Sequence, residues 1–399
     1  MKYSTLSSKL SDSPTLAMAA KAKKLVSEGL DIISFSAGEP DFHTPAQVKA
    51  AGIAAIKKNI TGYTASSGTP ELRKHVARWM TREVGVEYAP NQILVSSGAK
   101  FAIAAAILAT VDPGDEVIFP APYWVSYPDM IKLAGAEPIP VETDLAHGFK
   151  MTPSALEASI TPKTKMVLLN SPNNPTGAVY SHTELIALAE VLARFPEVWI
   201  LSDEIYSRLI FDGKKHRSIA AISSNIAERT IIVNGVSKAF SMTGWRIGWA
   251  AGPKELIARA GKIQSHTTSC PSSISQSAAE AALQMDDSFM ADWVEQYSRR
   301  RDIFIDLLKA VPGIKPFVPD GAFYLFCDIR QWIGKTKPKG GKLSSCFDAA
   351  EYLLDEAMIA AVPGDAFGAE GYIRFSFACS EDDIRRGVPR IAEAAGKLK

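Results

Sequence analysis

The sequence has little of what marks several classes of protein. Its four cysteines, Cys270, Cys327, Cys346 and Cys379, form no CxxC pair, so neither a disulfide scaffold nor a cysteine metal site is expected. Its six histidines contain no HExxH motif, and metal chemistry therefore has no support. The formal net charge of +1 argues against a dedicated nucleic-acid binder, which usually carries a strong basic excess.

Long apolar runs are also absent. No segment is long enough to cross a bilayer, and the N-terminus lacks the apolar core of a secretion signal. We therefore expect a cytoplasmic protein with reduced thiols and no membrane partner. With 399 residues, 47% of them hydrophobic and 22% charged, the chain is long enough for two structural units.

From about residue 90 onward, short apolar segments alternate with helical ones. We expect buried strands over 92–97, 116–120, 165–170, 198–202, 230–235 and 247–252. Helices are expected over 99–111 and 183–195, the second opened by a capping box of Ser181 and Glu184. This pattern predicts a doubly wound α/β unit with a mostly parallel sheet.

The C-terminal part has a different pattern. A long amphipathic helix is expected over 291–311. It is followed by strand-like, helical and strand-like segments over 321–329, 347–357 and 371–379. This order predicts a second, α+β unit.

Unusual polar clusters follow four of the expected strands. They are SSGAK after 92–95, NSPNNPTG after 166–169, SDEIY after 198–201 and NGVSK after 230–233. Ligands of open parallel sheets bind beyond the carboxyl ends of the strands, so we expect these clusters to converge on one crevice.

Three of the clusters have plain alternatives. SSGAK and NNP are compatible with ordinary turns, and Asp203 with a structural salt bridge, since a buried carboxylate should face a cation. The functional alternative for SSGAK is a phosphate site, made by the amides of Gly98, Ala99 and Lys100 at a helix N-terminus. GAK is not a Walker A loop, so a nucleoside triphosphate is not indicated.

The fourth cluster contains Lys238, surrounded by glycines, hydroxyls and aromatics in NGVSKAFSMTGWRIGW (234–249). This lysine either extends to solvent or is a desolvated amine with a depressed pKa, suited to forming a Schiff base. A phosphate site, a buried acid and such a lysine in one crevice together indicate pyridoxal 5′-phosphate. Arg246 and Ser237 would then bind the phosphate, and Asp203 the pyridinium nitrogen.

Seven motifs resemble those of the class I/II aminotransferases of PLP fold type I, and most of all the bacterial aspartate aminotransferases of the thermophilic and rhizobial branch. They are SAGEPDF (36–42), GYTASSGTPELR (62–73), PYWVSYP (122–128), NSPNNPTG (170–177), SDEIY (202–206), SKAFSMTGWRIGW (237–249) and YIRFSFA (372–378). The resemblance implies a large domain over 46–294 with a mostly parallel seven-stranded sheet between helices. It also implies an N-terminal arm and a smaller α+β domain formed by 1–45 and 295–399, which closes over substrate.

The resemblance further implies catalytic and cofactor-binding roles. Lys238 would bind the cofactor and shuttle the substrate proton, and Asp203 would keep the ring nitrogen protonated. Tyr206 and Asn174 would hydrogen-bond the cofactor O3′, and Trp124 would stack on the ring. The phosphate would be held by Ser237, Arg246 and the amides at Gly98, Ala99 and Lys100, with Tyr63 donated by the second subunit of a homodimer.

Substrate-binding roles follow from the same resemblance. Arg374 would bind the α-carboxylate bidentately, assisted by the backbone of Gly38 and by contacts with Trp124 and Asn174. In the branch that the chain resembles, a lysine just after the phosphate-loop glycine binds the side-chain carboxylate with help from an arm serine, and Lys100 and Ser13 match those positions. The arginine that animal and enteric aspartate aminotransferases donate from the neighbouring subunit has no counterpart in 262–276. We therefore expect aspartate and glutamate with 2-oxoglutarate and oxaloacetate as substrates, although Lys100 is also compatible with a solvated lysine at a helix start.

Other activities stay open as alternatives. Relatives that accept prephenate carry a basic residue before the Pro-Ser of the arm. Here LSDSPTLA (10–17) has Asp12 before Ser13, which disfavours prephenate. Tyrosine or phenylalanine would fit if Lys100 swings out. β-Elimination by a C–S lyase, decarboxylation and cyclopropane-forming synthesis use the same scaffold. A PLP-binding regulator fused to a DNA-binding domain is disfavoured, since no helix-turn-helix segment precedes SAGEPDF.

Overall fold

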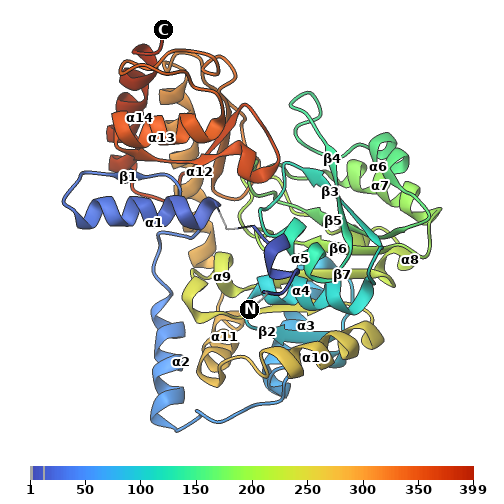
Figure 1. The fold of residues 1–399 in the computed structure, drawn as a ribbon. Helices are drawn as coiled ribbons and strands as arrows, with labels where there is room; N and C mark the ends of the chain where they lie inside the picture. Colours follow the sequence, from blue (N-terminus) through green and yellow to red (C-terminus); the bar gives the residue numbers. More distant parts are fainter. Residues whose placement is uncertain (1–2, 12–13) are drawn as a thin grey trace.

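The structure, a computed structural model, describes residues 3–11 and 14–399. A seven-stranded sheet forms the centre of its larger part (Figure 1). Six strands are parallel to one another, and β8 runs antiparallel between β2 and β7. The strands in spatial order are β2 (Ile93–Ser96), β8 (Gly248–Ala251), β7 (Thr230–Gly235), β6 (Trp199–Asp203), β5 (Thr164–Asn170), β3 (Glu116–Ala121) and β4 (Glu137–Glu142).

Six of these strands confirm the segments expected from the sequence, whereas β4 was not anticipated. Its sequence, EPIPVE, contains two prolines and two carboxylates and does not resemble a buried strand. β4 lies at the edge of the sheet, beside β3, where proline and charge are tolerated because one side of the strand has no neighbour to bond.

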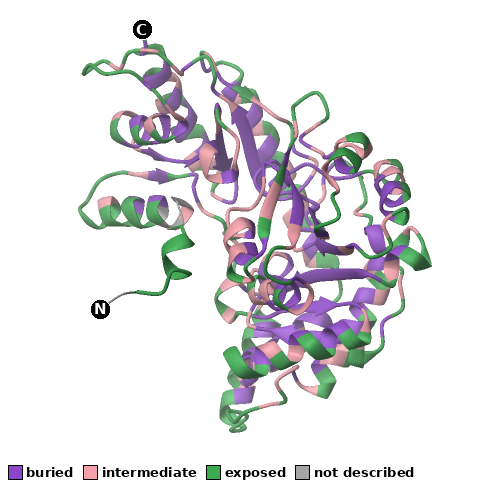
Figure 2. Cartoon of the chain, turned by 45° about the vertical axis from the view of Figure 1, so that its right-hand side comes forward, coloured by how far each residue is buried: buried purple, intermediate pink, exposed green. Residues whose placement is uncertain are grey.

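Helices cover both faces of the sheet, which explains why its inner strands are apolar throughout. Met166 and Leu168 point to one face and Val167 and Leu169 to the other. Figure 2 shows these strands buried in the middle of the molecule. One face packs against α4 (Ala99–Thr110), α5 (Tyr127–Leu133) and α10 (Lys254–Thr267). Helices on the other face include α3 (Pro70–Val84), α6 (Pro153–Ser159) and α7 (His182–Ala193).

The second unit is built from the C-terminal part of the chain. Its four-stranded antiparallel sheet has the order β12 (Val362–Pro363), β13 (Tyr372–Ser376), β10 (Tyr324–Asp328) and β9 (Lys315–Pro316). The helices of this unit are α12 (Ser288–Leu308), α13 (Cys346–Ala357) and α14 (Glu381–Gly396). The helix expected over 291–311 is thus α12, which ends before Pro312 because the residue preceding a proline disfavours helical geometry.

The N-terminal segment joins this second unit. β1 (Ile33–Ser34) pairs in parallel with β11 (Ile359–Ala360), and α1 (Pro14–Ser27) packs beside them (Figure 1). The domain boundaries expected from the sequence, 46–294 against 1–45 and 295–399, stay a prediction.

Short helices complete the fold. They are α2 (Ala46–Lys57), α8 (Ser224–Ala227), α9 (Val236–Ala239) and α11 (Ser273–Leu283). At the start of α7 the expected capping box is confirmed: the Ser181 hydroxyl accepts from the Glu184 amide at 3.3 Å, and the Glu184 carboxylate accepts from the Ser181 amide at 2.7 Å.

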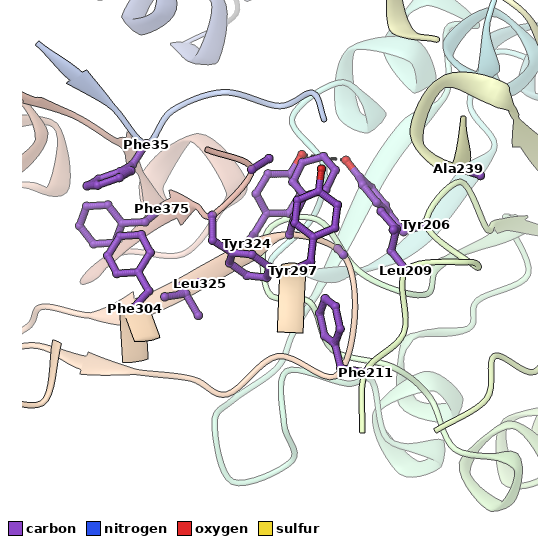
Figure 3. Packing of buried hydrophobic residues seen from close by; sticks show 14 of the residues in the cluster. Phe35, Tyr206, Leu209, Phe211, Ala239, Tyr297, Phe304, Tyr324, Leu325 and Phe375 are labelled. Carbon is purple, nitrogen blue, oxygen red and sulfur yellow. Dashed lines mark hydrogen bonds between the residues drawn. The ribbon is translucent and has the colours of Figure 1, made fainter. Parts of the chain in front are cut away.

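One apolar cluster runs from the large sheet into the second unit. In it Phe35 packs on Phe304 with ring centroids 4.8 Å apart, and Tyr206 packs on Phe323 at 5.5 Å. Figure 3 shows these rings continuing from α12 and β10 to the segment that carries Tyr206. The cluster fixes the position of the second unit's sheet against the carboxyl end of β6.

Candidate active site

The polar clusters converge as the topology predicted. A cavity of about 710 Å³ lies beyond the carboxyl ends of β5, β6 and β7 and extends to the start of α4. Its walls include eleven described residues to which the sequence assigned a role: Gly38, Ala99, Lys100, Trp124, Asn174, Asp203, Tyr206, Ser237, Lys238, Arg246 and Arg374. Ser13 lies outside the described residues. Tyr63 lies outside this cavity and is 94% exposed.

Lys238 lies on α9, the short helix that directly follows β7. Its Nζ donates a hydrogen bond of 2.5 Å to the carbonyl oxygen of Gly38. Burial lowers the pKa of the Lys238 amine to about 8, although the nearby Glu39 carboxylate raises it. About a tenth of the amine is therefore neutral and nucleophilic at pH 7, far more than of an ordinary surface lysine.

Asp203 ends β6 and is 3% exposed. Its partner differs from the expected cation: the Tyr127 hydroxyl donates to Oδ2 at 2.6 Å, and the Ile205 amide donates to Oδ1 at 3.2 Å. Burial raises the pKa of Asp203 to about 6, while these hydrogen bonds and the Lys238 charge lower it. The carboxylate is therefore mostly ionised at neutral pH and can still receive a further donor from the cavity.

The phosphate site expected at the start of α4 has the geometry of an anion cradle. The residue before α4 is Gly98, which has no side chain to cap the first turn and has a φ of +85°. A Cβ on Gly98 would lie 2.4 Å from Nη2 of Arg246, and a Cβ on Gly248 would lie 2.3 Å from the Ala99 nitrogen. The two glycines thus let a guanidinium and the amides of a helix N-terminus approach the same point, where a phosphate is favoured.

Arg374 lies on β13 and is 3% exposed. Nη1 donates to Oδ1 of Asn174 at 2.9 Å, and Nη2 donates to the Ser36 carbonyl at 3.0 Å. Nε is buried and has no partner within the described part of the chain. A buried guanidinium bonded to neutral oxygens, with its Nε unpartnered, fits a carboxylate supplied by a substrate.

Trp124 and Lys100 form another part of the wall. Nζ of Lys100 lies 5.0 Å from the centre of the Trp124 ring. Burial and the charge of Arg246 lower the pKa of Lys100. Lys100 therefore lines the cavity while it is also exposed in this chain, which is compatible both with a substrate-facing lysine and with a solvated lysine at a helix start.

Two tyrosines of the site received no role from the sequence. Tyr127, in the PYWVSYP motif, bonds Asp203, and its position three residues after Trp124 was the available signal. Tyr324 lines the cavity from β10 and places its hydroxyl 2.7 Å from that of Tyr206. Only the pairing of distant segments brings Tyr324 to the site, so no local pattern could have indicated it.

The described residues contain neither a metal site nor a membrane span. Among residues 3–11 and 14–399, no group of three or more His, Cys, Asp or Glu side chains is placed to hold a metal ion. No helix in the same ranges is long and apolar enough to cross a membrane.

Comparison with known proteins places this site in a family. Residues 30–391 match the sequence model described as aminotransferase class I and II. The chain is 48% identical over 379 residues to an aspartate/prephenate aminotransferase of Cereibacter sphaeroides, covering 95% of each protein. It is 45% identical to an aspartate aminotransferase of Rhizobium meliloti, covering 97% of this chain and 94% of the relative.

Solved structures agree with these matches. The crystal structure of the aspartate aminotransferase from Rhizobium meliloti superimposes with a TM-score of 0.96 at 43% identity, covering 100% of both chains. The structure of the Thermus thermophilus aspartate aminotransferase with maleate superimposes with a TM-score of 0.91 at 40% identity, covering 99% of this chain and 100% of that one. The expected fold type I architecture is thereby confirmed, and the chain belongs to the class I and II aminotransferases.

Proposed function

We propose that this protein is a pyridoxal 5′-phosphate-dependent aspartate aminotransferase that exchanges amino groups between aspartate or glutamate and 2-oxoglutarate or oxaloacetate. The observation that carries the proposal is the convergence of a half-buried, low-pKa Lys238 with buried Asp203 and Arg374 in one cavity. The relatives named aspartate aminotransferase support the choice of substrate.

The residues present fit the cofactor. Its phosphate would lie against the start of α4, with Arg246 and Ser237, where the close approach at Gly98 leaves no room for a side chain. Its ring nitrogen would donate to Asp203, and Lys238 would hold its carbonyl carbon. When bound, the cofactor supplies an aldehyde that condenses with amines and a ring that withdraws electrons.

The protein's own groups then do three things. Arg374 binds and orients the substrate α-carboxylate, which fixes the α-carbon near Lys238. The Lys238 amine, partly neutral because burial lowers its pKa to about 8, would accept the α-carbon proton and pass it to the cofactor carbon that had carried the aldehyde oxygen. The Asp203 carboxylate, held in place by Tyr127, stabilises positive charge at the far end of the cavity.

The preference for dicarboxylates is assigned to Lys100. Its ammonium lies on the cavity wall beside Trp124, where a side-chain carboxylate of aspartate or glutamate would find a partly desolvated cation. The aromatic alternative requires this lysine to move out of the cavity.

A homodimer is part of the proposal. Ile53, Ile56 and Ile60, on and just after α2, are 53%, 53% and 44% exposed, and Tyr63 nearby is 94% exposed. Exposed apolar side chains grouped in one segment mark an interaction surface. A second copy seated there would cover the isoleucines and carry Tyr63 to the partner's phosphate site, as the family resemblance implies. We also propose a cytoplasmic location, consistent with the free thiols of the four cysteines.

Substrate assays test the proposed function directly. We expect the purified protein to be yellow, to lose that colour with aspartate, and to form oxaloacetate and glutamate when 2-oxoglutarate is added. Release of pyruvate from cysteine conjugates in place of amino transfer would support the C–S lyase alternative. Colour that persists in saturating amino acid would support the regulatory alternative and contradict the transaminase.

Replacing Lys100 tests the basis of selectivity. In Lys100→Ala, kcat/KM for aspartate should fall about ten- to a hundredfold, because a charge-assisted hydrogen bond is lost. Activity with alanine or phenylalanine should change less than about threefold. Lys132→Ala, which removes a lysine paired with Asp129 outside the cavity, is the control. An equal fall in kcat/KM for all substrates would contradict a selective role for Lys100.

A further inference from the structure

Tyr324 joins the two units of the protein at the active site. It is fully buried on β10, in the second unit, whereas Tyr206 follows β6 of the large sheet. Their hydroxyl oxygens are 2.7 Å apart, so one phenol donates to the other. Figure 3 shows the two hydroxyls pointing toward each other at the junction between the units.

The ring of Tyr324 is held in place on both sides. The guanidinium of Arg374 lies 4.3 Å from its centre, and the Phe323 ring lies 4.8 Å away. β10 and β13 are paired, with Tyr324 opposite Ser376 and Phe326 opposite Arg374. Tyr324 therefore stands between the arginine that receives the substrate carboxylate and the phenol of Tyr206, and it has no freedom to turn away.

The direction of the hydroxyl bond decides what Tyr206 can do. Each phenol has one proton, so if Tyr206 donates to Tyr324, it has none for any other acceptor. If Tyr324 donates, the Tyr206 proton is free for an acceptor in the cavity. Burial raises the pKa of both phenols. When an oxygen acceptor in the cavity takes the single Tyr206 proton, the Tyr206 oxygen, 2.7 Å from that of Tyr324, can only accept from Tyr324.

We propose that Tyr324 is a positioning residue whose hydroxyl donates to Tyr206 and thereby directs the Tyr206 proton into the cavity. This inference rests on the proposed function, in which that proton is given to the O3′ oxygen of pyridoxal phosphate. Because Tyr324 shares a sheet with Arg374, the unit that receives the substrate also sets the hydrogen bonding of the cofactor.

The experiment compares Tyr324→Phe with a matched variant, Tyr352→Phe. The Tyr352 hydroxyl also makes one buried bond, donating to the Ala394 carbonyl at 2.8 Å, but it lies between α13 and α14, away from the cavity. Cofactor-free proteins are titrated with pyridoxal phosphate, and the dissociation constant is measured by quenching of tryptophan fluorescence. We expect about three- to tenfold weaker binding for Tyr324→Phe and no change for Tyr352→Phe. The thermal unfolding midpoints of both cofactor-free variants should fall by similar amounts.

Repeating the substitution in the Tyr206→Phe variant distinguishes a positioning role of Tyr324 from a direct contact with the cofactor. In Tyr206→Phe, which binds the cofactor more weakly itself, adding Tyr324→Phe should change the dissociation constant by less than about twofold, because Tyr324 acts through the Tyr206 hydroxyl. The inference is overturned if Tyr324→Phe weakens cofactor binding in the Tyr206→Phe variant as much as it does in the wild-type protein. It is also overturned if Tyr324→Phe alone leaves cofactor binding unaltered. Failure of the wild-type protein to bind pyridoxal phosphate would instead overturn the proposed function, and this inference with it.

Discussion

Lys238→Ala is expected to reduce transamination by about four orders of magnitude or more, the largest effect of any single substitution in this protein. The variant loses both the amine that holds the cofactor and the proton carrier for the substrate α-carbon, and proton transfer alone contributes about 10²–10⁴-fold. The low pKa of this amine depends on its buried position, so a lysine elsewhere cannot replace it. The quantity to measure is kcat/KM for aspartate with 2-oxoglutarate.

Covalent trapping makes this prediction specific to one amine. Wild-type protein incubated with pyridoxal phosphate and borohydride should carry a reduced adduct on the peptide containing Lys238, and the Ala variant should carry none there. Lys262→Ala, on α10 and absent from the cavity walls, should retain both activity and adduct. Near-normal turnover in Lys238→Ala, or trapping at a different lysine, would falsify the assignment.

Arg374→Lys is expected to lower kcat/KM about a hundredfold for every amino acid substrate. The ammonium preserves the charge but not the planar set of donors, and the oxygens of Asn174 and Ser36 that bind the guanidinium lose a partner in a buried site. The loss should lie mainly in KM, since the carboxylate is bound before and during the reaction.

The pattern across substrates distinguishes Arg374 from Lys100. Arg374→Lys should impair alanine and aspartate alike, because both carry an α-carboxylate, whereas Lys100→Ala should impair only dicarboxylates. Arg386→Lys is the control, since Arg386 is a surface residue bonded to Asp31. If Arg374→Lys spared alanine, Arg374 would not be the α-carboxylate site.

The sequence predicted most of the site because its chemistry is concentrated at strand ends. Asp203 ends β6 and Lys238 comes three residues after the end of β7, and the topology of a parallel sheet brings such positions together. Tyr127 and Tyr324 were not predicted. Their roles depend on contacts with Asp203 and Tyr206 that are 76 and 118 residues away along the chain, and those contacts are set by packing rather than by any local pattern.

The fold, like the site, was predicted where a local sequence pattern exists and missed where it does not. Six strands of the large sheet and the helices α4, α7, α12 and α13 were identified from their periodicity, within a few residues of their ends, whereas the amphipathic helices α3 and α14 were not predicted. β4 was missed because an edge strand does not need the apolar composition of a central one. The carbonyl partner of Lys238, Gly38, was expected only to assist substrate binding, since a backbone acceptor leaves no trace in side-chain composition.

The pairing of β1 with β11 means that the C-terminal unit is discontinuous along the polypeptide. No single cut can release that unit intact: a fragment starting near residue 295 would lack β1 and the Phe35 ring that packs on Phe304 and Phe375. Synthesis must therefore reach the last hundred residues before the segment around Ile33 finds its neighbour. Folding of the first and last parts of this polypeptide is consequently one cooperative event, not two independent ones.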